Sequence, residues 1–151
     1  MARYSAGVLT GAGSTTLPII SLYAIANVGG ELREVGLTNT TSTAVALRMI
    51  RLAAAGTQGA GLAEAKHNPT SAAASCTAFT THTVDPTAGS VDLGYRASLG
   101  AAVGAGVIWT FGATGIRVGN ATGGTTTADG VGVIVENGTG QACQAYLVWD
   151  E

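Results

Sequence analysis

The sequence predicts an all-β fold, an antiparallel β-sandwich or jelly-roll-like barrel with long Gly/Ala/Thr-rich loops and little helix. Along several short segments, apolar side chains alternate with polar or small ones, as they do in half-buried strands. Stretches rich in Gly, Asn and Thr separate these segments, and such residues are typical of turns between strands. No change in composition divides the chain, so we expect one β domain over residues 1–151.

The N-terminal third predicts an arm followed by strands. Residues 1–15 are mostly small or polar, and we expect them to form an extended N-terminal arm. Residues 16–26 are rich in β-forming residues, and Pro18 among them indicates an edge strand or the start of a strand. Residues 31–37 and 45–50 alternate in polarity on either side of NTTST at 39–43. This pattern predicts a β-hairpin.

The middle of the chain predicts a long loop. Residues 53–75 show little periodicity and many small side chains, and loops of this length are often functional or mobile. The best helical signal is GLAEAKH at 61–67, which Asn68-Pro69 would end after one turn. Short strands are expected at 79–84 and 95–99.

The run from Ala97 to Ile116 has no charged side chain and is long enough to cross a bilayer. Its last part, VIWTFGATGIRV at 107–118, alternates in polarity and holds a Gly-rich turn at 112–115. We therefore expect a second hairpin and no membrane segment, because Gly, Ser and Thr interrupt any helix here.

The C-terminal segments at 131–135 and 143–149 also alternate, and NGTG at 137–140 separates them. This combination predicts a third hairpin. The strongest candidates for the core are Trp109, Phe111, Leu147 and Trp149.

Charge excludes some partners. Charged residues make up 11% of the chain, against roughly 25% in a typical soluble domain. The net charge is −2 and the seven cations are scattered, so no basic stripe is available for phosphates and we expect no nucleic-acid partner. The first 20 residues lack a continuous apolar segment, which argues against a signal peptide. The acceptor triplets at Asn39, Asn120 and Asn137 are therefore read as chance matches.

No catalytic, cofactor-binding or metal-binding residues are predicted. His67 and His82 lack metal-ligand spacing with each other or with Cys76 and Cys143, and we expect solvated histidines. The two cysteines are expected as buried thiols, with a disulfide as the alternative. No G-x-S-x-G elbow is present, and GTQGAG at 56–61 lacks the Lys-Ser/Thr of a phosphate loop. Most carboxylates lie beside turns or at the C-terminus and are expected in solvent: Glu31, Glu34, Glu64, Asp85, Asp92, Asp129, Glu136, Asp150 and Glu151.

Three stretches carry a resemblance to a known class of proteins. They are MARYSAGVLTGAGSTTLPIISLYAIAN at the start, ELREVGLTNTTSTAVALRMIRL in the centre, and the ending GVIWTFGATGIRV and GVGVIVENGTGQACQAYLVWDE. Together they resemble small structural proteins of tailed bacteriophages that infect actinobacteria. The W-x-F segment at 109–111 and the closing YLVWDE are their most distinctive parts.

The resemblance implies a non-enzymatic capsid decoration (cement) protein, made in the host cytoplasm and located on the virion surface. Such proteins are small β-rich folds, often homotrimers, and their partner is the major capsid protein of the phage head. The arm at 1–15 and the loop at 53–75 are the candidate lattice contacts. The alternatives are a tail or head-fibre component, or a host-surface or glycan-binding β-sandwich module.

Several segments carry apolar residues on both faces. If the protein is an oligomer, the second faces would be buried between subunits; otherwise, they are covered within one subunit. The residues concerned are Ile108, Tyr146 and Val148, and Ile50 and Leu52.

Overall fold

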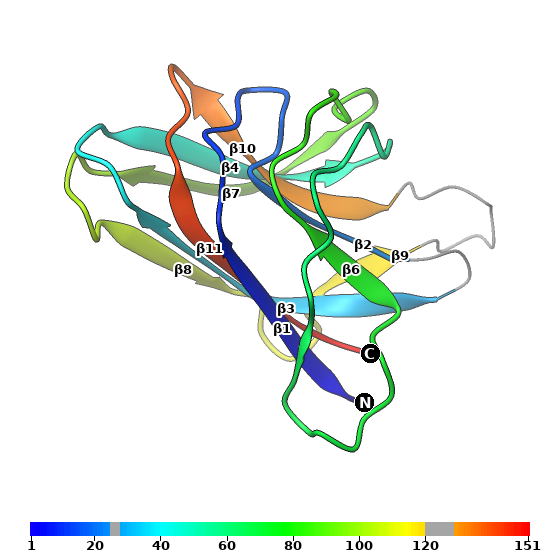
Figure 1. Ribbon diagram of the computed structural model, residues 1–151. Helices are drawn as coiled ribbons and strands as arrows, with labels where there is room; N and C mark the ends of the chain where they lie inside the picture. Colours follow the sequence, from blue (N-terminus) through cyan, green and yellow to red (C-terminus); the bar gives the residue numbers. More distant parts are fainter. Residues whose placement is uncertain (25–27, 120–128) are drawn as a thin grey trace.

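The computed structural model describes residues 1–24, 28–119 and 129–151. These residues contain no helix and form two antiparallel sheets in a sandwich-like arrangement (Figure 1). The expected all-β fold is confirmed.

The larger sheet has six strands in the order β5-β1-β11-β3-β8, with β9 also paired to β3. Its strands are β1 (Arg3–Leu9), β3 (Gly29–Asn39), β5 (Ala65–Lys66), β8 (Gly106–Thr110), β9 (Ile116–Gly119) and β11 (Cys143–Asp150). The smaller sheet has five strands in the order β6-β2-β10-β4-β7. Its strands are β2 (Ile20–Ala24), β4 (Val45–Leu52), β6 (Cys76–Phe79), β7 (Val91–Leu99) and β10 (Gly130–Asn137).

The main core lies between the two sheets, where alternate side chains of each strand meet. Trp149 is 0% exposed and Leu147 is 2% exposed, while Trp109 and Phe111 are each 8% exposed. The four residues expected in the core are therefore buried.

Two expected hairpins are wrong in their pairing. β3 and β4 lie in different sheets, and so do β10 and β11. Each NTTST or NGTG connection therefore crosses from one sheet to the other instead of joining hydrogen-bonded neighbours. The alternation of side chains specifies which face of a strand is buried, and the turn residues specify that the chain reverses. A hairpin and a crossing between sheets share these two features, so the sequence pattern does not distinguish them.

The expected hairpin at 107–118 is also wrong, although its turn is present. Gly112 and Gly115 both take a φ of 65°, which L side chains rarely adopt. After this turn β9 pairs with β3 at Gly29–Leu32, beyond the part of β3 that pairs with β8. The two strands thus follow one another along the same partner.

Three further expectations need correction, and for Pro18 the structure decides between the two alternatives. Residues 3–9 of the expected arm form β1, which lies between β5 and β11. Pro18 precedes β2, an inner strand, so it marks the start of a strand and not an edge. Residues 61–67 form no helical turn and instead contain β5. The strand expected at 79–84 lies earlier, at 76–79, whereas the one expected at 95–99 is confirmed within β7.

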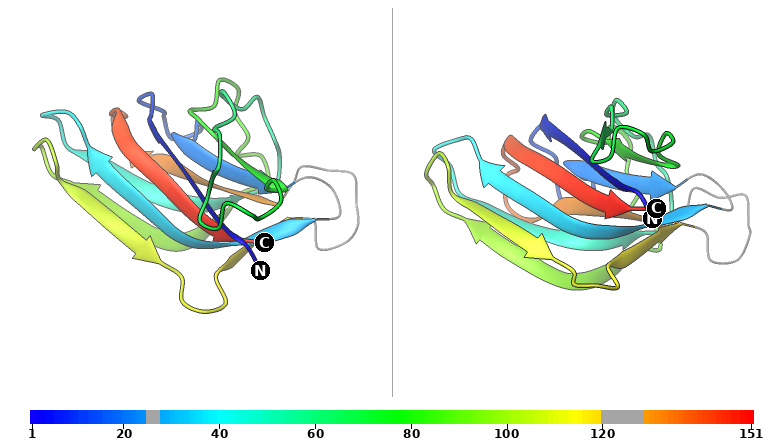
Figure 2. Two further views of the ribbon diagram at one scale, coloured as in Figure 1. Left: turned by 60° about the horizontal axis from the view of Figure 1, so that its bottom comes forward. Right: turned by 90° about the horizontal axis from the view of Figure 1, so that it is seen from below.

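The two sides of the sandwich at which the sheets end differ in how their edge strands are covered. On the side of β5 and β6, which we call the closed side, the long segment after β4 runs past the strand edges (Figure 2). On the side of β7 and β8, the open side, the two edge strands run next to each other, and no such segment of the described residues lies over them (Figure 2).

Candidate functional site

The two histidines have different environments. His67 is exposed, and its Nε2 lies 3.2 Å from Ser5 Oγ, in accordance with the expected solvated histidine. His82 is 1% exposed, so the same expectation is wrong for it. Its Nε2 lies 2.8 Å from the buried Ser21 Oγ, and burial lowers the pKa of His82 to about 4. This Ser–His pair is closed to solvent, so its geometry supports packing and not attack on a substrate.

The cysteines are both buried and both free, as expected. Burial raises the pKa of the Cys76 and Cys143 thiols, which disfavours the reactive thiolate. Among the residues that the structure describes, no group of three His, Cys, Asp or Glu side chains is placed to hold a metal ion.

One carboxylate expected in solvent is buried. Asp150 is 5% exposed; Arg3 Nε donates to its Oδ1 at 2.7 Å and Arg33 Nε donates to its Oδ2 at 2.8 Å. The hydrogen bond from Arg3 leads the contacts that lower the pKa of Asp150, and Arg33 adds to it. Arg33 also donates to the carbonyl oxygens of Gly112 and Ala113. This network ties the turn after β8 to both ends of the chain and has the character of a structural anchor.

The outer face of the six-stranded sheet offers the most distinctive surface. Its residues follow from the register, because inward and outward side chains alternate. Across β1, β11, β3 and β8 the three central rows read Leu9–Gln144–Thr38–Gly106, Gly7–Tyr146–Gly36–Ile108 and Ser5–Val148–Glu34–Thr110. Glu34 is the one charged residue in these rows.

Tyr146 lies flat at the centre of this face. A Cβ at Gly36 would collide with the Tyr146 ring, so glycine is required where the ring crosses β3. The Tyr146 hydroxyl donates to Glu34 Oε1 at 2.6 Å, and this bond, together with burial, raises the pKa of Tyr146 to about 12. The bond occupies one Glu34 oxygen and holds the ring against the sheet.

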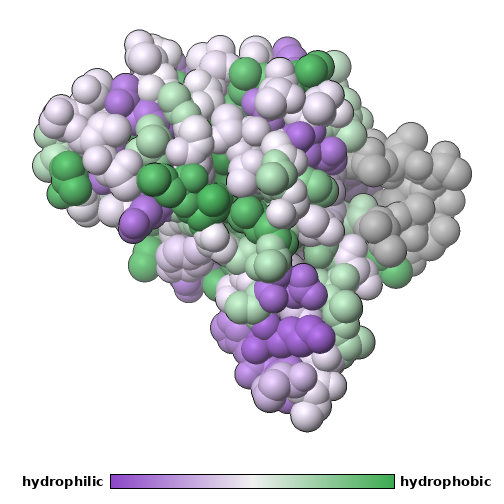
Figure 3. All heavy atoms as spheres, viewed as in Figure 1, coloured by the Kyte–Doolittle hydropathy of each residue, from purple (hydrophilic) through white to green (hydrophobic). Residues whose placement is uncertain are grey.

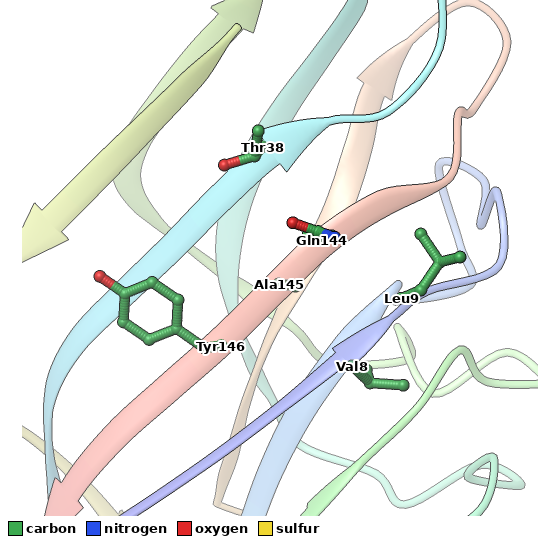
Figure 4. A pocket seen from close by; sticks show the side chains of 6 residues that line it. All are labelled: Val8, Leu9, Thr38, Gln144, Ala145 and Tyr146. Atoms are coloured by element: carbon green, nitrogen blue, oxygen red, sulfur yellow. The ribbon is translucent and has the colours of Figure 1, made fainter. Parts of the chain in front are cut away.

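A groove of about 400 Å³ runs beside the ring. Val8, Leu9, Thr38, Gln144, Ala145 and Tyr146 line it (Figure 4). Leu9 and Tyr146 stand at opposite ends, and the amide of Gln144 lies between Leu9 and Thr38 (Figure 4). Leu9 is 61% exposed, and hydrophobic residues form a band over β11 and β1 on the same side of the molecule (Figure 3).

Part of the opposite outer face, on the five-stranded sheet, is covered within the chain. Ile50 is 1% exposed and Leu52 is 0% exposed, and they form a second cluster with Tyr23 and Ile134, against which Phe79 packs. For this pair the alternative of cover within one subunit is therefore correct. Ile108, in contrast, is 61% exposed, and Tyr146 and Val148 are partly exposed.

The sequence identified three apolar residues of the six-stranded face but missed the residues that shape it. Gly7, Gly36, Thr38 and Gln144 lie beside Tyr146 only because of the register between β1, β11 and β3. The signal available in the sequence was the period-2 pattern, which places Tyr146 and Gln144 outward but does not identify their neighbours across the sheet.

Comparisons of the chain with protein-family models, with curated proteins and with solved structures find no match. Within the described residues, no helix has the length and apolar character needed to cross a membrane.

Proposed function

We propose that this protein is a non-enzymatic structural component of a phage virion, a capsid decoration protein that binds the outside of the head lattice. The observation that carries the proposal is the outer face of the six-stranded sheet. It is nearly uncharged, is flattened by glycine at Gly7 and Gly36, and contains a groove lined by apolar and uncharged polar side chains. Such a face is suited to a flat protein contact.

The described residues contain no evident catalytic or metal centre. This is consistent with a structural role, but the proposal does not depend on it. The buried Ser21–His82 pair is closed to solvent, and the buried carboxylate of Asp150 is paired with Arg3 and Arg33. The partner that this proposal implies is the major capsid protein, and the location is the capsid surface. Repetition of the contact over the lattice would add the strength that a single small groove lacks.

The two candidate lattice contacts from the sequence need revision. Deleting residues 1–15 would remove β1 from between β5 and β11, so the deletion would test folding and not binding. Residues 53–75 cover the closed side and bond to the chain there, for example where Ala72 O accepts from the Tyr4 hydroxyl at 3.0 Å. The groove on the six-stranded sheet replaces both as the proposed lattice contact.

The test is binding of the purified protein to phage heads that lack it. We expect Leu9→Glu, at the rim of the groove, to reduce occupancy at least tenfold, because a carboxylate would be buried against an apolar contact. The control is Val84→Glu, which places the same charge at a residue of similar exposure, 54% against 61%, away from this face. Equal occupancy for both variants would remove the groove from the proposal.

Copy number distinguishes the alternatives. Hundreds of copies on purified heads, counted by mass spectrometry or cryo-EM, would support decoration, whereas a few copies confined to tails would favour a tail or fibre component. A glycan-binding module would need aromatic rings on one surface. Tyr4 and Tyr23 are buried, and Tyr95 and Tyr146 lie on different strands, on β7 and β11.

A further inference from the structure

Four of the five edge strands of the sandwich, β5, β6, β7 and β8, are protected to different degrees. β5 has only two residues, and one of them is Lys66. The outer edge of β6 is occupied by the long loop, since Leu62 N donates to Ala78 O at 2.8 Å and Thr80 N donates to Ala60 O at 3.0 Å. Short length, charge and cover by a loop all prevent an edge from pairing with another chain.

On the open side, β7 is protected and β8 is not. β7 carries Asp92 and Arg96, which form ion pairs with Arg48 and Glu136, and its pairing with β4 is irregular near Gly94. β8 reads GVIWT, with no charge, no proline and no shift in its register with β3. Its outer edge therefore has none of the devices that discourage pairing.

The hydrogen bonds show which backbone groups of β8 are free. Phe111 N donates to Arg33 O at 2.9 Å and Ala105 O accepts from Asn39 N at 2.7 Å, so the odd-numbered residues face β3. Because antiparallel strands alternate, the N–H and C=O groups of Gly106, Ile108 and Thr110 point away from the sheet.

Exposed apolar side chains gather on the same side. Seven large apolar residues are exposed in the described part of the chain, and four of them lie on β7, on β8 or on the turn between them. These four are Val91, Tyr95, Val103 and Ile108. The free backbone edge is thus flanked by apolar surface.

We propose that β8 pairs antiparallel with β8 of a second copy of this chain, centred on Ile108. The turn before Gly106 and the turn at 112–115 limit the free edge to five residues, which places its centre at Ile108. Ile108 then faces Ile108 of the other copy, and Gly106 faces Thr110. In this pairing no charged side chain faces one of the same sign. A strand of a different protein would need a charged residue or a pocket on β8 to be recognised specifically, and β8 has neither.

The pairing is expected to be weak. A strand of five residues is only about 17 Å long, and it buries less than the roughly 1,200–2,000 Å² typical of stable complexes. Association therefore depends on protein concentration and would be favoured where copies are held close together, as on a lattice. The inference concerns contacts between copies of this chain and is tested without capsids, so its failure leaves the binding test above unaffected.

The first test is sedimentation of the isolated protein at concentrations up to roughly 1 mM. We expect the mass to rise toward twice that of the monomer. Ile108→Lys should weaken the association by roughly tenfold or more, because two ammonium groups would face each other across the new pair. Val84→Lys is the matched control, since Val84 is 54% exposed, against 61% for Ile108, and lies outside both β8 and the groove.

A second test reports the register directly. Residues facing each other in a hydrogen-bonded antiparallel pair have Cα atoms about 5.5 Å apart, which a disulfide can span. With oxidised glutathione as the oxidant, Ile108→Cys should give a covalent pair, and Val84→Cys, at an exposed residue outside β8 and the groove, should not. A monomer at every concentration, a trimer as the resemblance implies, or equal behaviour of the two cysteine variants would each overturn the proposal.

Discussion

The closed and open sides of the sandwich differ in how far their edge strands are covered by the rest of the chain. On the closed side the chain covers its own edges. Glu151 accepts from Ser75 N at 2.6 Å and from Cys76 N at 2.7 Å, which fixes the end of the long loop. On the open side Tyr95 is 36% exposed and rests on Phe111, with ring centroids 5.0 Å apart, and β8 keeps free backbone groups. The closed side thus contributes stability, and the open side keeps exposed apolar side chains and backbone groups.

The largest difference is expected between the two tryptophans. Trp149 is 0% exposed on the closed side, stacks on Tyr4 at 5.9 Å and donates from Nε1 to Glu151 Oε1 at 2.9 Å. Trp149→Ala should lower the free energy of unfolding by about 3 to 5 kcal/mol in a denaturant titration. Trp109→Ala, on the open side, should cost less, because Trp109 is 8% exposed next to the partly exposed Tyr95. An equal loss for both would contradict the contrast between the sides.

The next effect is a dependence on pH that arises near the closed side. His82 has a folded pKa of about 4, lowered by burial below its ordinary value of 6.5. The unfolded chain therefore binds a proton at a pH where the folded chain does not, so stability is full above pH 6.5 and is lost as the pH falls toward 4. We expect a loss on the order of 2 to 3 kcal/mol over this range.

His82→Gln should reduce the slope of stability against pH between 6.5 and 4, because it removes the buried imidazole. Below pH 4 the protonation of Asp150 adds a second loss, because the pKa of Asp150 is lowered in the folded protein. A slope that survives His82→Gln at pH 5 to 6 would show that another group titrates there.

The sequence predicted the layers of the fold but not the pairing of strands within them. Alternation placed Trp109 and Trp149 inward, since an inward side chain needs only the period of its own strand. Whether β10 and β11 are neighbours or lie in opposite sheets depends on contacts far apart in sequence, which local turns do not encode. The three hairpins failed for this reason.

The candidate surface was predictable to a similar extent. Ile108 was recognised as outward and apolar, but the freedom of its strand edge depends on the position of β8 at the end of the sheet. Likewise, His82 stands in the polar segment TTHTV, and its burial comes from packing against Tyr23 and Ser21 of β2. Tertiary packing overrides local polarity at both positions.

A smaller effect is expected from the carboxylate that fixes the long loop. Glu151→Ala leaves Ser75 N and Cys76 N without their acceptor and should cost about 1 to 2 kcal/mol. Amide exchange should become faster between residues 65 and 76 and stay unchanged on β7 and β8. Glu151→Gln keeps an acceptor oxygen and should restore part of the protection; failure to restore any would assign the effect to the charge.

The smallest effect is expected on the open side, at low protein concentration where the chain is a monomer. Tyr95→Ala removes the edge-to-face contact with Phe111 and the contact with Trp109, whose ring centroid lies 6.2 Å away. Because Tyr95 is already 36% exposed, we expect a loss of only about 1 kcal/mol. Val103→Ala, at a 74% exposed residue of the neighbouring turn, should change stability by less than about 0.5 kcal/mol. A loss at Tyr95 as large as that at Trp149 would mean that the open side is part of the stabilising core, and its exposed residues could then no longer be assigned to contact alone.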